Sequence, residues 1–345
     1  MKIHRRILLL VSLTISLSAC YSNEQVKTPD LKTPEIGTLV PVTTLETQVP
    51  DEINPSLPVG TMESNTPEVY ETSSIQFNAY MCEAEACILE QPFLLKRPIA
   101  PGLTDWIDAT YPFGDTSAGK YDIHHGVEFI NPSGTEVLAV GNGVVRAAGD
   151  DLKTRYSNWL DFYGNVVIIE HQQNEIPEPI FTVYGHLSEI NVSVGQEVQQ
   201  GQLIGLVGAT GYAIGSHLHF EVRFGNDLYN HTVNPVLWLV PRVSDSDGVL
   251  GNLSGQLINR WGELVKGKQI TIEALQKDGL GRMRRYFINT YADVDLSRVS
   301  PYHENFSLAD LPAGKYRISV VNGKLFESTV TIIPGQTTYI TLRVP

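Results

Sequence analysis

The sequence predicts an all-β protein in which two folded domains follow a long N-terminal extension. Its 345 residues suit about two domains of ordinary size. From about Pro101 onward, short apolar runs are separated by glycines, and none shows a convincing helical period. Before that point, residues 21–76 are rich in prolines, threonines and acidic residues. We therefore divide the chain into residues 1–19, 20–76, 77–100, 101–245 and 246–345.

Residues 1–19 are predicted to be an export signal. Lys2, Arg5 and Arg6 precede an apolar run that is too short to span a bilayer. The run ends in L-S-A-C, which resembles the bacterial lipobox and implies that Cys20 carries a lipid. Since several acyl chains anchor a protein stably, we expect an extracytoplasmic protein anchored to a cell membrane, inner or outer according to the envelope. The alternative is an ordinary signal peptide with an incidental cysteine.

Residues 20–76 are predicted to form a disordered tether. Positions 21–76 hold seven of the 20 prolines, nine threonines and nine acidic residues against two basic ones. Such a segment buries too little apolar surface to offset the entropy of ordering, and its composition favours an extended chain. The net charge of the whole chain, −13, also argues against nucleic acid as a partner.

The lead-in, residues 77–100, contains the motif M-C-E-A-E-A-C. Outside the cytoplasm, Cys82 and Cys87 are expected to form a local disulfide. The alternative is a metal-binding pair, but the chain has only three cysteines in total, too few to complete a thiolate site.

Residues 101–245 read as a β domain with closely spaced strands. Gly recurs every few residues over 194–208, as tight β corners require. The expected strands are 136–140, 144–148, 165–171, 180–184, 202–207 and 218–224.

Residues 246–345 alternate apolar and polar side chains, as half-buried strands do. The expected strands are 255–259, 269–274, 305–308, 315–321, 327–333 and 337–344. The stretch 304–320 (E-N-F-S-L-A-D-L-P-A-G-K-Y-R-I-S-V) resembles carboxypeptidase-regulatory or transthyretin-like modules. That resemblance implies a Greek-key β-sandwich without catalytic residues of its own; the alternative is a generic immunoglobulin-like sandwich.

Three histidine motifs stand out: H-H-G-V-E (124–128), V-Y-G-H-L (183–187) and H-L-H-F-E-V (217–222). Residues two apart in a strand share a face, so His217 and His219 project together. A bend at Gly126 would bring His124 and Glu128 together. Two imidazoles and one carboxylate with an open fourth position are typical of catalytic zinc.

For each of two residues near these motifs, the sequence allows two roles. His125 is expected on the opposite face from His124, but it would serve as the ligand if the bend ran differently. Glu221 either orients a ligating ring or is a solvated strand residue.

In this order and spacing, from Tyr111-Pro-Phe-Gly114 to Asn234-Pro235, the motifs resemble the lysostaphin/LytM-type zinc metallopeptidases. The resemblance implies a barrel-like β-sheet domain with Zn²⁺ held by His124, Glu128 and His219. It implies His217 and His186 as the catalytic histidines. The implied reaction is attack by a zinc-bound water on peptide bonds in the stem peptides or cross-bridges of peptidoglycan.

One departure from the family pattern concerns position 128, which is Glu where Asp is usual. The alternative function is therefore a catalytically weak or inactive LytM-like module that binds or regulates cell-wall hydrolases, its potential partners.

Two further classes fit poorly. A lipoyl-type carrier needs a lysine at a hairpin tip, and residues 160–240 contain none. A cupin-type metal site is suggested by H-x-H alone.

The insertion 150–163, with Trp159, is the candidate wall of a substrate groove; the alternative is a loop packed on the domain.

Overall fold

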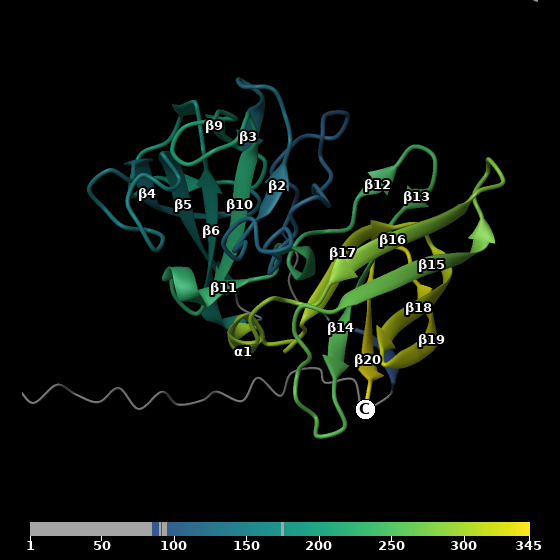
Figure 1. The fold of residues 1–345 in the computed structure, drawn as a ribbon. Helices are drawn as coiled ribbons and strands as arrows, with labels where there is room; N and C mark the ends of the chain where they lie inside the picture. Colours follow the sequence, from purple (N-terminus) through teal and green to yellow (C-terminus); the bar gives the residue numbers. More distant parts are fainter. Residues whose placement is uncertain (1–84, 90, 92–94, 174–175) are drawn as a thin grey trace, which may run out of the picture. The chain divides into compact units, whose positions relative to one another are not determined.

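The computed structural model describes residues 85–89, 91, 95–173 and 176–345, which all belong to one compact unit, Thr72–Pro345. The export signal, Cys20, the tether and Cys82 lie outside the described residues. In the described part the helical elements are α1 (Asp295–Val299) and two 3₁₀ turns, η1 (Tyr229–His231) and η2 (Pro235–Leu237). The predicted all-β class is confirmed (Figure 1). No helix in these ranges is long and apolar enough to cross a membrane.

The first folded region is built on a seven-stranded sheet with the order β11-β10-β6-β5-β4-β8, in which β2 also pairs with β10. Its strands are β2 (Val127–Phe129), β4 (Gly143–Asp150), β5 (Asn165–Gln173), β6 (Ile176–Gly185), β8 (Glu197–Val198), β10 (Leu218–Phe224) and β11 (Thr232–Val233). A smaller sheet has the order β3-β9-β7, with strands β3 (Glu136–Leu138), β7 (Glu189–Ile190) and β9 (Leu203–Leu206).

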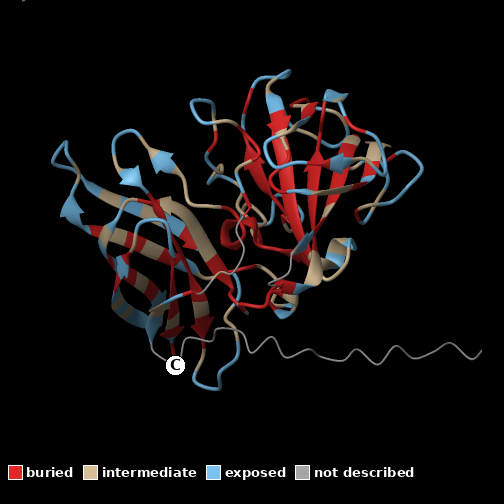
Figure 2. Cartoon of the chain, turned by 180° about the vertical axis from the view of Figure 1, so that it is seen from behind, coloured by how far each residue is buried: buried red, intermediate tan, exposed pale blue. Residues whose placement is uncertain are grey.

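The central strands of this sheet are buried on both faces. In β5, Val167 and Ile169 join the main core, whereas Val166 and Ile168 join a second cluster with Tyr163. Figure 2 shows these strands as almost continuously buried. A strand covered on both sides is rich in apolar residues, which explains the run N-V-V-I-I in the sequence.

β10 departs from that pattern in an informative way. Leu218, Phe220 and Val222 join the main core. The alternate residues His219, Glu221 and Arg223 are equally buried and face the other side. The sheet therefore carries a row of buried polar side chains, and His219 at one end of this row belongs to the candidate site described below.

The second folded region is a sandwich of two four-stranded sheets, with the orders β1-β20-β14-β17 and β16-β15-β18-β19. Both sheets contribute to one apolar core, including Leu253, Phe306 and Ile318. The predicted sandwich is confirmed, whereas its relation to transthyretin-like modules stays a prediction. The strands are β1 (Ala86–Ile88), β14 (Gly251–Ile258), β15 (Gln269–Lys277), β16 (Met283–Asn289), β17 (Phe306–Leu311), β18 (Gly314–Asn322), β19 (Lys324–Ile332) and β20 (Thr337–Arg343); β12 (Val243–Ser244) and β13 (Gly248–Val249) form a small hairpin before it.

Two strands of the sandwich were not expected from sequence. β1 comes from the lead-in and pairs antiparallel with β20, so part of the lead-in belongs to the sandwich. β16 reads M-R-R-Y-F-I-N, in which Phe287 is exposed and two arginines interrupt the apolar pattern. Cys87 lies in β1 and is disulfide-bonded. Its predicted pairing with Cys82 and the five segment boundaries stay predictions.

Candidate metal centre

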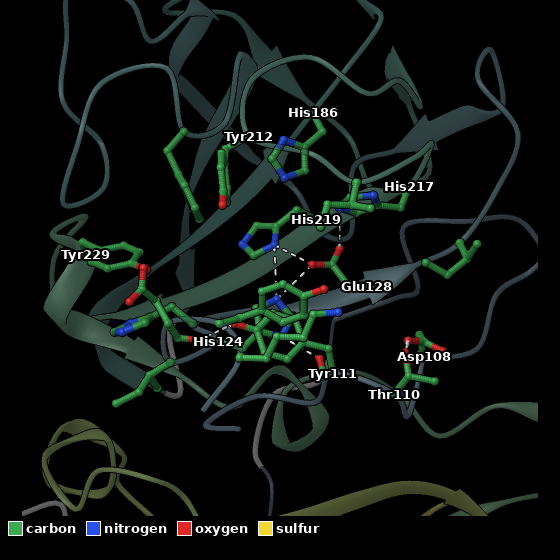
Figure 3. Close-up of a pocket in the computed structure, with 18 of the residues that line it drawn as sticks. Asp108, Thr110, Tyr111, His124, Glu128, His186, Tyr212, His217, His219 and Tyr229 are labelled. Carbon is green, nitrogen blue, oxygen red and sulfur yellow. Dashed lines mark hydrogen bonds and ion pairs between the residues drawn. The ribbon is translucent and has the colours of Figure 1, made fainter. Parts of the chain in front are cut away.

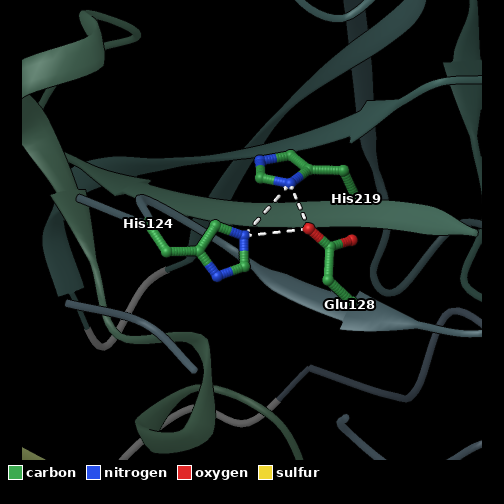
Figure 4. Close-up of side chains that lie close together, drawn as sticks. All are labelled: His124, Glu128 and His219. Atoms are coloured by element: carbon green, nitrogen blue, oxygen red, sulfur yellow. Dashed lines mark hydrogen bonds and ion pairs between the residues drawn. The ribbon is translucent and has the colours of Figure 1, made fainter. Parts of the chain in front are cut away.

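Three predicted ligands from two strands and a loop converge on one point. His124 precedes β2, Glu128 lies in β2, and His219 lies opposite Glu128 in the pairing of β2 with β10. Glu128 Oε1 is 2.9 Å from His124 Nε2 and 3.0 Å from His219 Nδ1, and these two nitrogens are 3.4 Å apart (Figure 4). All three residues are buried, and their donor atoms lie within 4.8 Å of one another.

The second nitrogen of each imidazole is already committed. His124 Nδ1 donates to the Tyr111 carbonyl at 2.6 Å, and His219 Nε2 donates to Glu221 Oε1 at 3.1 Å. The nitrogens that face Glu128 are therefore unprotonated in the neutral rings. Three lone-pair-bearing atoms that point at one another repel unless a positive charge lies among them; in the metal-free site that charge is a proton on His219, and a metal ion would replace it. Two imidazole nitrogens and a carboxylate oxygen are the donor set of catalytic zinc, so the residues present fit that metal.

Glu221 belongs to a buried network behind the site. It accepts hydrogen bonds from Tyr163 Oη at 2.6 Å and Arg223 Nε at 2.9 Å, and Arg223 Nη2 also donates to Tyr163 Oη at 2.8 Å. All three side chains are inaccessible to solvent. Of the two interpretations for Glu221, the structure supports the one in which it orients the His219 ring.

The charges in this network set the pKa values of the site. Burial alone would raise the pKa of Glu128, but the charge of His219 and hydrogen bonds from both imidazoles hold it well below its usual range. Burial also opposes the charge of Glu221, yet Arg223 and His219 lower the pKa of Glu221 to about 2. For His219, burial is outweighed by Glu128 and Glu221, which raise its pKa to about 10. In the metal-free site the protonated His219 therefore balances Glu128, and Arg223 balances Glu221; a metal ion that displaces the His219 proton would take over the pairing with Glu128.

Gly126 is needed for space as well as for chain direction. A Cβ atom at this position would lie 2.6 Å from His219 Cε1 and 2.8 Å from the Phe220 carbonyl oxygen. The sequence predicts only a bend at this glycine. The structure adds that the His219 ring packs directly over its Cα, which a side chain would prevent.

His217 and His186 lie beside the proposed ligands. His217 Nε2 is 3.2 Å from Glu128 Oε2 but makes no hydrogen bond with it, and the His186 and His217 rings are 4.8 Å apart. His186 directly follows β6 and has a left-handed backbone (φ 62°), and its Nδ1 donates to the Thr210 carbonyl at 2.9 Å. Burial, with the charges of His219 and His217, lowers the pKa of His186 to about 3.

These side chains line an open pocket of about 460 Å³. Figure 3 shows His186 and Tyr212 along one side and Tyr111 along the other, with Glu128 and His219 between them. Trp159 and Phe162 from the predicted insertion also line it, 5.0 Å apart in an edge-to-face contact. The walls are therefore aromatic around a polar floor.

The remaining histidines of the described residues lie apart from the three donors. His125 borders the pocket, where its Nδ1 is 2.6 Å from Thr232 Oγ1 and its ring stacks on Tyr229. His171 is buried between the Asn142 carbonyl and Thr182. His231 Nδ1 bonds to the Phe224 carbonyl at 3.0 Å, and His303 Nδ1 bonds to the Ser297 carbonyl at 3.3 Å. The alternative that placed His125 among the ligands is not favoured by this geometry.

Tyr111, Tyr163 and Arg223 contribute to the site but were not among the predicted site residues. Arg223 could have been predicted, because the two-residue period of β10 places it on the same face as His219 and Glu221. Tyr111 stacks on His124 with ring centroids 4.2 Å apart, and Tyr163 comes from a loop before β5. No local signal indicates either contact.

Comparison with known proteins adds an independent observation. A model of Peptidase family M23 matches residues 122–235, a range that contains the three donors, His186, His217 and the Glu221 network. Residues 122–235 are an M23 peptidase domain. The predicted resemblance to lysostaphin/LytM-type peptidases is thereby confirmed for this region, and this M23 domain carries the candidate metal centre.

Several curated proteins are similar to the M23 domain. Peptidoglycan DD-endopeptidase ShyC of Vibrio cholerae is 38% identical over 103 residues, which is 30% of this chain and 21% of that protein. Glycyl-glycine endopeptidase ALE-1 of Staphylococcus capitis is 31% identical over 166 residues, 48% of this chain and 41% of its own length. Cell division protein DipM of Caulobacter vibrioides is 33% identical over 137 residues, 39% of this chain and 20% of that protein.

The matches thus cover between a fifth and two fifths of these relatives' own length. Among solved structures, a zinc-containing peptidase from Vibrio cholerae shares 29% identity with a TM-score of 0.33, covering 41% of this chain and 39% of that one. The catalytic domain of lysostaphin from Staphylococcus simulans shares 32% identity with a TM-score of 0.29, covering 36% of this chain and 82% of that one.

Proposed function

We propose that the M23 domain is an active zinc endopeptidase that cleaves peptide bonds in the stem peptides or cross-bridges of peptidoglycan. The observation that carries the proposal is the convergence of His124 Nε2, Glu128 Oε1 and His219 Nδ1, all directed at one point beside an open pocket. The names of related proteins, which include a peptidoglycan endopeptidase, support the substrate class.

His124, Glu128 and His219 would hold the metal. When bound, zinc supplies Lewis-acid chemistry and acidifies water at neutral pH. The hydrogen bonds to the Tyr111 carbonyl and to Glu221 keep both imidazoles in the tautomers that ligation needs. This chain therefore sets the ligand geometry before the metal arrives.

His217 is the proposed general base. Its Nδ1 faces the Gly215 carbonyl at 3.1 Å, so that nitrogen is the donor and Nε2 bears the lone pair directed into the pocket. An imidazole placed this way accepts the proton of the attacking water. We expect it then to return that proton to the leaving amine or to His186.

His186 presents a second lone pair. Because its Nδ1 donates to the Thr210 carbonyl, its Nε2 is unprotonated in the neutral ring. His186 can therefore stabilise the developing oxyanion only after Nε2 has taken up a proton. Its burial, which lowers its pKa, favours rapid release of that proton to the leaving amine.

The test measures new amine termini released from purified peptidoglycan by the zinc-loaded protein. We expect His217→Ala to reduce the rate by about 10²–10⁴-fold, the usual contribution of a general base. His303→Asn is the matched control, because His303 is an exposed sandwich residue with a positive φ that Asn tolerates. Chelation should abolish activity and added zinc should restore it. Full activity in His217→Ala would refute the assigned role.

A second candidate function is a regulatory module that binds cell-wall hydrolases without cleaving peptidoglycan. It is favoured by Glu at position 128, since the longer side chain brings Oε2 within 3.2 Å of the proposed base. Glu128→Asp distinguishes the two. If the wild type binds zinc but releases no amines, and Glu128→Asp does release them, the regulatory function is supported.

We also propose that Cys20 carries a lipid and that residues 20–76 tether the folded part to a membrane beside its substrate. The support is the basic, apolar and L-S-A-C sequence of the first 20 residues. Cell fractionation of Cys20→Ser tests it. The variant should leave the membrane fraction, and retention there would exclude lipidation as the anchor.

A further inference from the structure

The loop that carries His124 is held in place by one short segment of the chain, residues 111–115. The His124 backbone makes two hydrogen bonds, from its N–H to the Asp115 carbonyl at 3.0 Å and from the Gly114 N–H to its own carbonyl at 2.8 Å. Its ring stacks on Tyr111 and donates to the Tyr111 carbonyl. The backbone and ring of this ligand are therefore held by residues 111–115.

That segment is in turn held by the C-terminal sandwich. The Ala292 N–H donates to the Gly114 carbonyl at 2.8 Å, and Asn289 Nδ2 donates to Asp115 Oδ2 at 2.7 Å. The Tyr291 ring lies against Gly114 so closely that a Cβ there would be 2.4 Å from Tyr291 Cδ1. Gly114 also has φ +78°, a conformation that suits glycine.

Tyr291 is itself held by packing and by two hydrogen bonds. Its side chain is 2% exposed, and its ring packs edge-to-face on Phe113 at 5.2 Å. Its hydroxyl accepts from Asn234 Nδ2 at 2.8 Å and donates to the buried Glu304 at 3.0 Å. Tyr291, which follows β16 of the sandwich, thus packs into the main core of the first folded region and contacts both the end of the M23 domain and the segment behind His124.

From these contacts we infer that Tyr291, with Ala292 and Asn289, acts as a positioning residue for the metal ligand His124. The C-terminal sandwich is then part of the support of the metal centre, in addition to any separate role. The inference rests on the proposed function only for the identity of the metal. Groups that hold metal ligands typically contribute about 10- to 100-fold to metal affinity.

The experiment measures the zinc dissociation constant of the full chain by competition with a chromogenic chelator. We expect Tyr291→Ala to weaken zinc binding by about 10- to 100-fold, and Tyr291→Phe, which keeps the ring on Gly114, to stay within about threefold of wild type. Tyr316→Ala is the matched control: Tyr316 is an equally buried sandwich tyrosine that bonds to Pro312. It should lower stability without changing zinc affinity.

A second pair of variants avoids removing a buried ring. Asn289 is exposed, and Asn289→Asp replaces the donor to Asp115 with a repelling carboxylate. It should weaken zinc binding, whereas Asn322→Asp, the same charge change at the end of β18, should not. The absorption bands of bound Co²⁺ should shift in Tyr291→Ala and Asn289→Asp only.

Two results would overturn the inference. One is wild-type zinc affinity in a folded Tyr291→Ala or, if that variant does not fold, in Asn289→Asp. The other is an equal loss in Tyr316→Ala, which would make general stability the cause. A wild type that binds zinc but hydrolyses nothing would remove the proposed function and leave this test unchanged.

Discussion

In the M23 domain, β10 buries His219, Glu221 and Arg223 on one face, whereas the core of the C-terminal sandwich is made of aliphatic and aromatic side chains. The sandwich keeps its main charge cluster, Glu273 between Arg285 and Arg317, on its outer face. Buried charges are tolerated where each polar atom has a partner, as around Glu221. The M23 sheet therefore buries charged side chains that contact the candidate metal centre, whereas the apolar core cluster of the sandwich contains none.

The largest expected difference between the two regions is in the free energy of unfolding lost when an arginine that pairs with a glutamate is replaced by methionine. Arg223→Met leaves Glu221 buried and without its ion pair, so we expect the free energy of unfolding to fall by about 3–5 kcal/mol. Arg317→Met removes a solvent-exposed partner of Glu273 and should leave the unfolding midpoint unchanged. Urea unfolding followed by tryptophan fluorescence measures both. Equal effects would contradict the contrast.

The two regions should also respond to pH in opposite directions. Burial lowers the pKa of His171 to about 4 and raises that of Glu304 to about 7. From pH 6.5 down to 4 only unfolded His171 binds a proton, so acid removes stability from the M23 domain. From pH 4.5 up to 7 only folded Glu304 holds its proton, so rising pH removes stability from the sandwich.

Each pKa shift corresponds to about 3 kcal/mol across its pH window. The measurement compares unfolding free energies of wild type, His171→Gln and Glu304→Gln between pH 4 and 7.5. Subtracting each variant from wild type isolates one group, and the two difference curves should slope in opposite directions. Parallel slopes would show that these buried groups do not carry the pH dependence.

A smaller effect tests whether the buried network serves the metal or only the fold. Glu221→Gln retains the shape of the side chain but weakens its hold on His219 Nε2. We expect zinc affinity to fall by about 10- to 100-fold. Glu170→Gln is the control, because Glu170 pairs with the half-exposed Arg146 outside the site. Lower stability with unchanged zinc affinity would assign the network to the fold alone.

The smallest effect compares two exposed aromatic residues. Tyr212 lines the pocket of the M23 domain, and Phe287 lies on the outer face of the sandwich. Replacing either with Ala should change the free energy of unfolding by less than about 0.5 kcal/mol. Only Tyr212→Ala should raise the KM for soluble peptidoglycan fragments, by about 2- to 10-fold for one lost aromatic contact. A similar rise in Phe287→Ala would place substrate on the sandwich.

Much of the site was predictable because it depends on local geometry. The two-residue period of a strand places His217 and His219 on one face, and the same rule extends to Glu221 and Arg223. Six strands of the first region were likewise indicated by apolar runs between glycines, namely β3, β4, β5, β6, β9 and β10. The short strands β2, β7, β8 and β11, of two or three residues each, were not expected. β1 and β16 were missed, since β1 has three residues and is recognisable only by its pairing with β20, and β16 exposes Phe287.

The sequence by itself determined the all-β class, the polar face of β10 and the candidate ligands, because side-chain alternation is a property of the backbone. Only the tertiary structure decided which atoms meet. Glu128 and His219 are 91 residues apart, and Asn289 and Asp115 are 174 apart. Contacts over such separations depend on how whole sheets pack, which no local pattern encodes. For that reason the support of His124 by Tyr291 is visible only in the folded molecule.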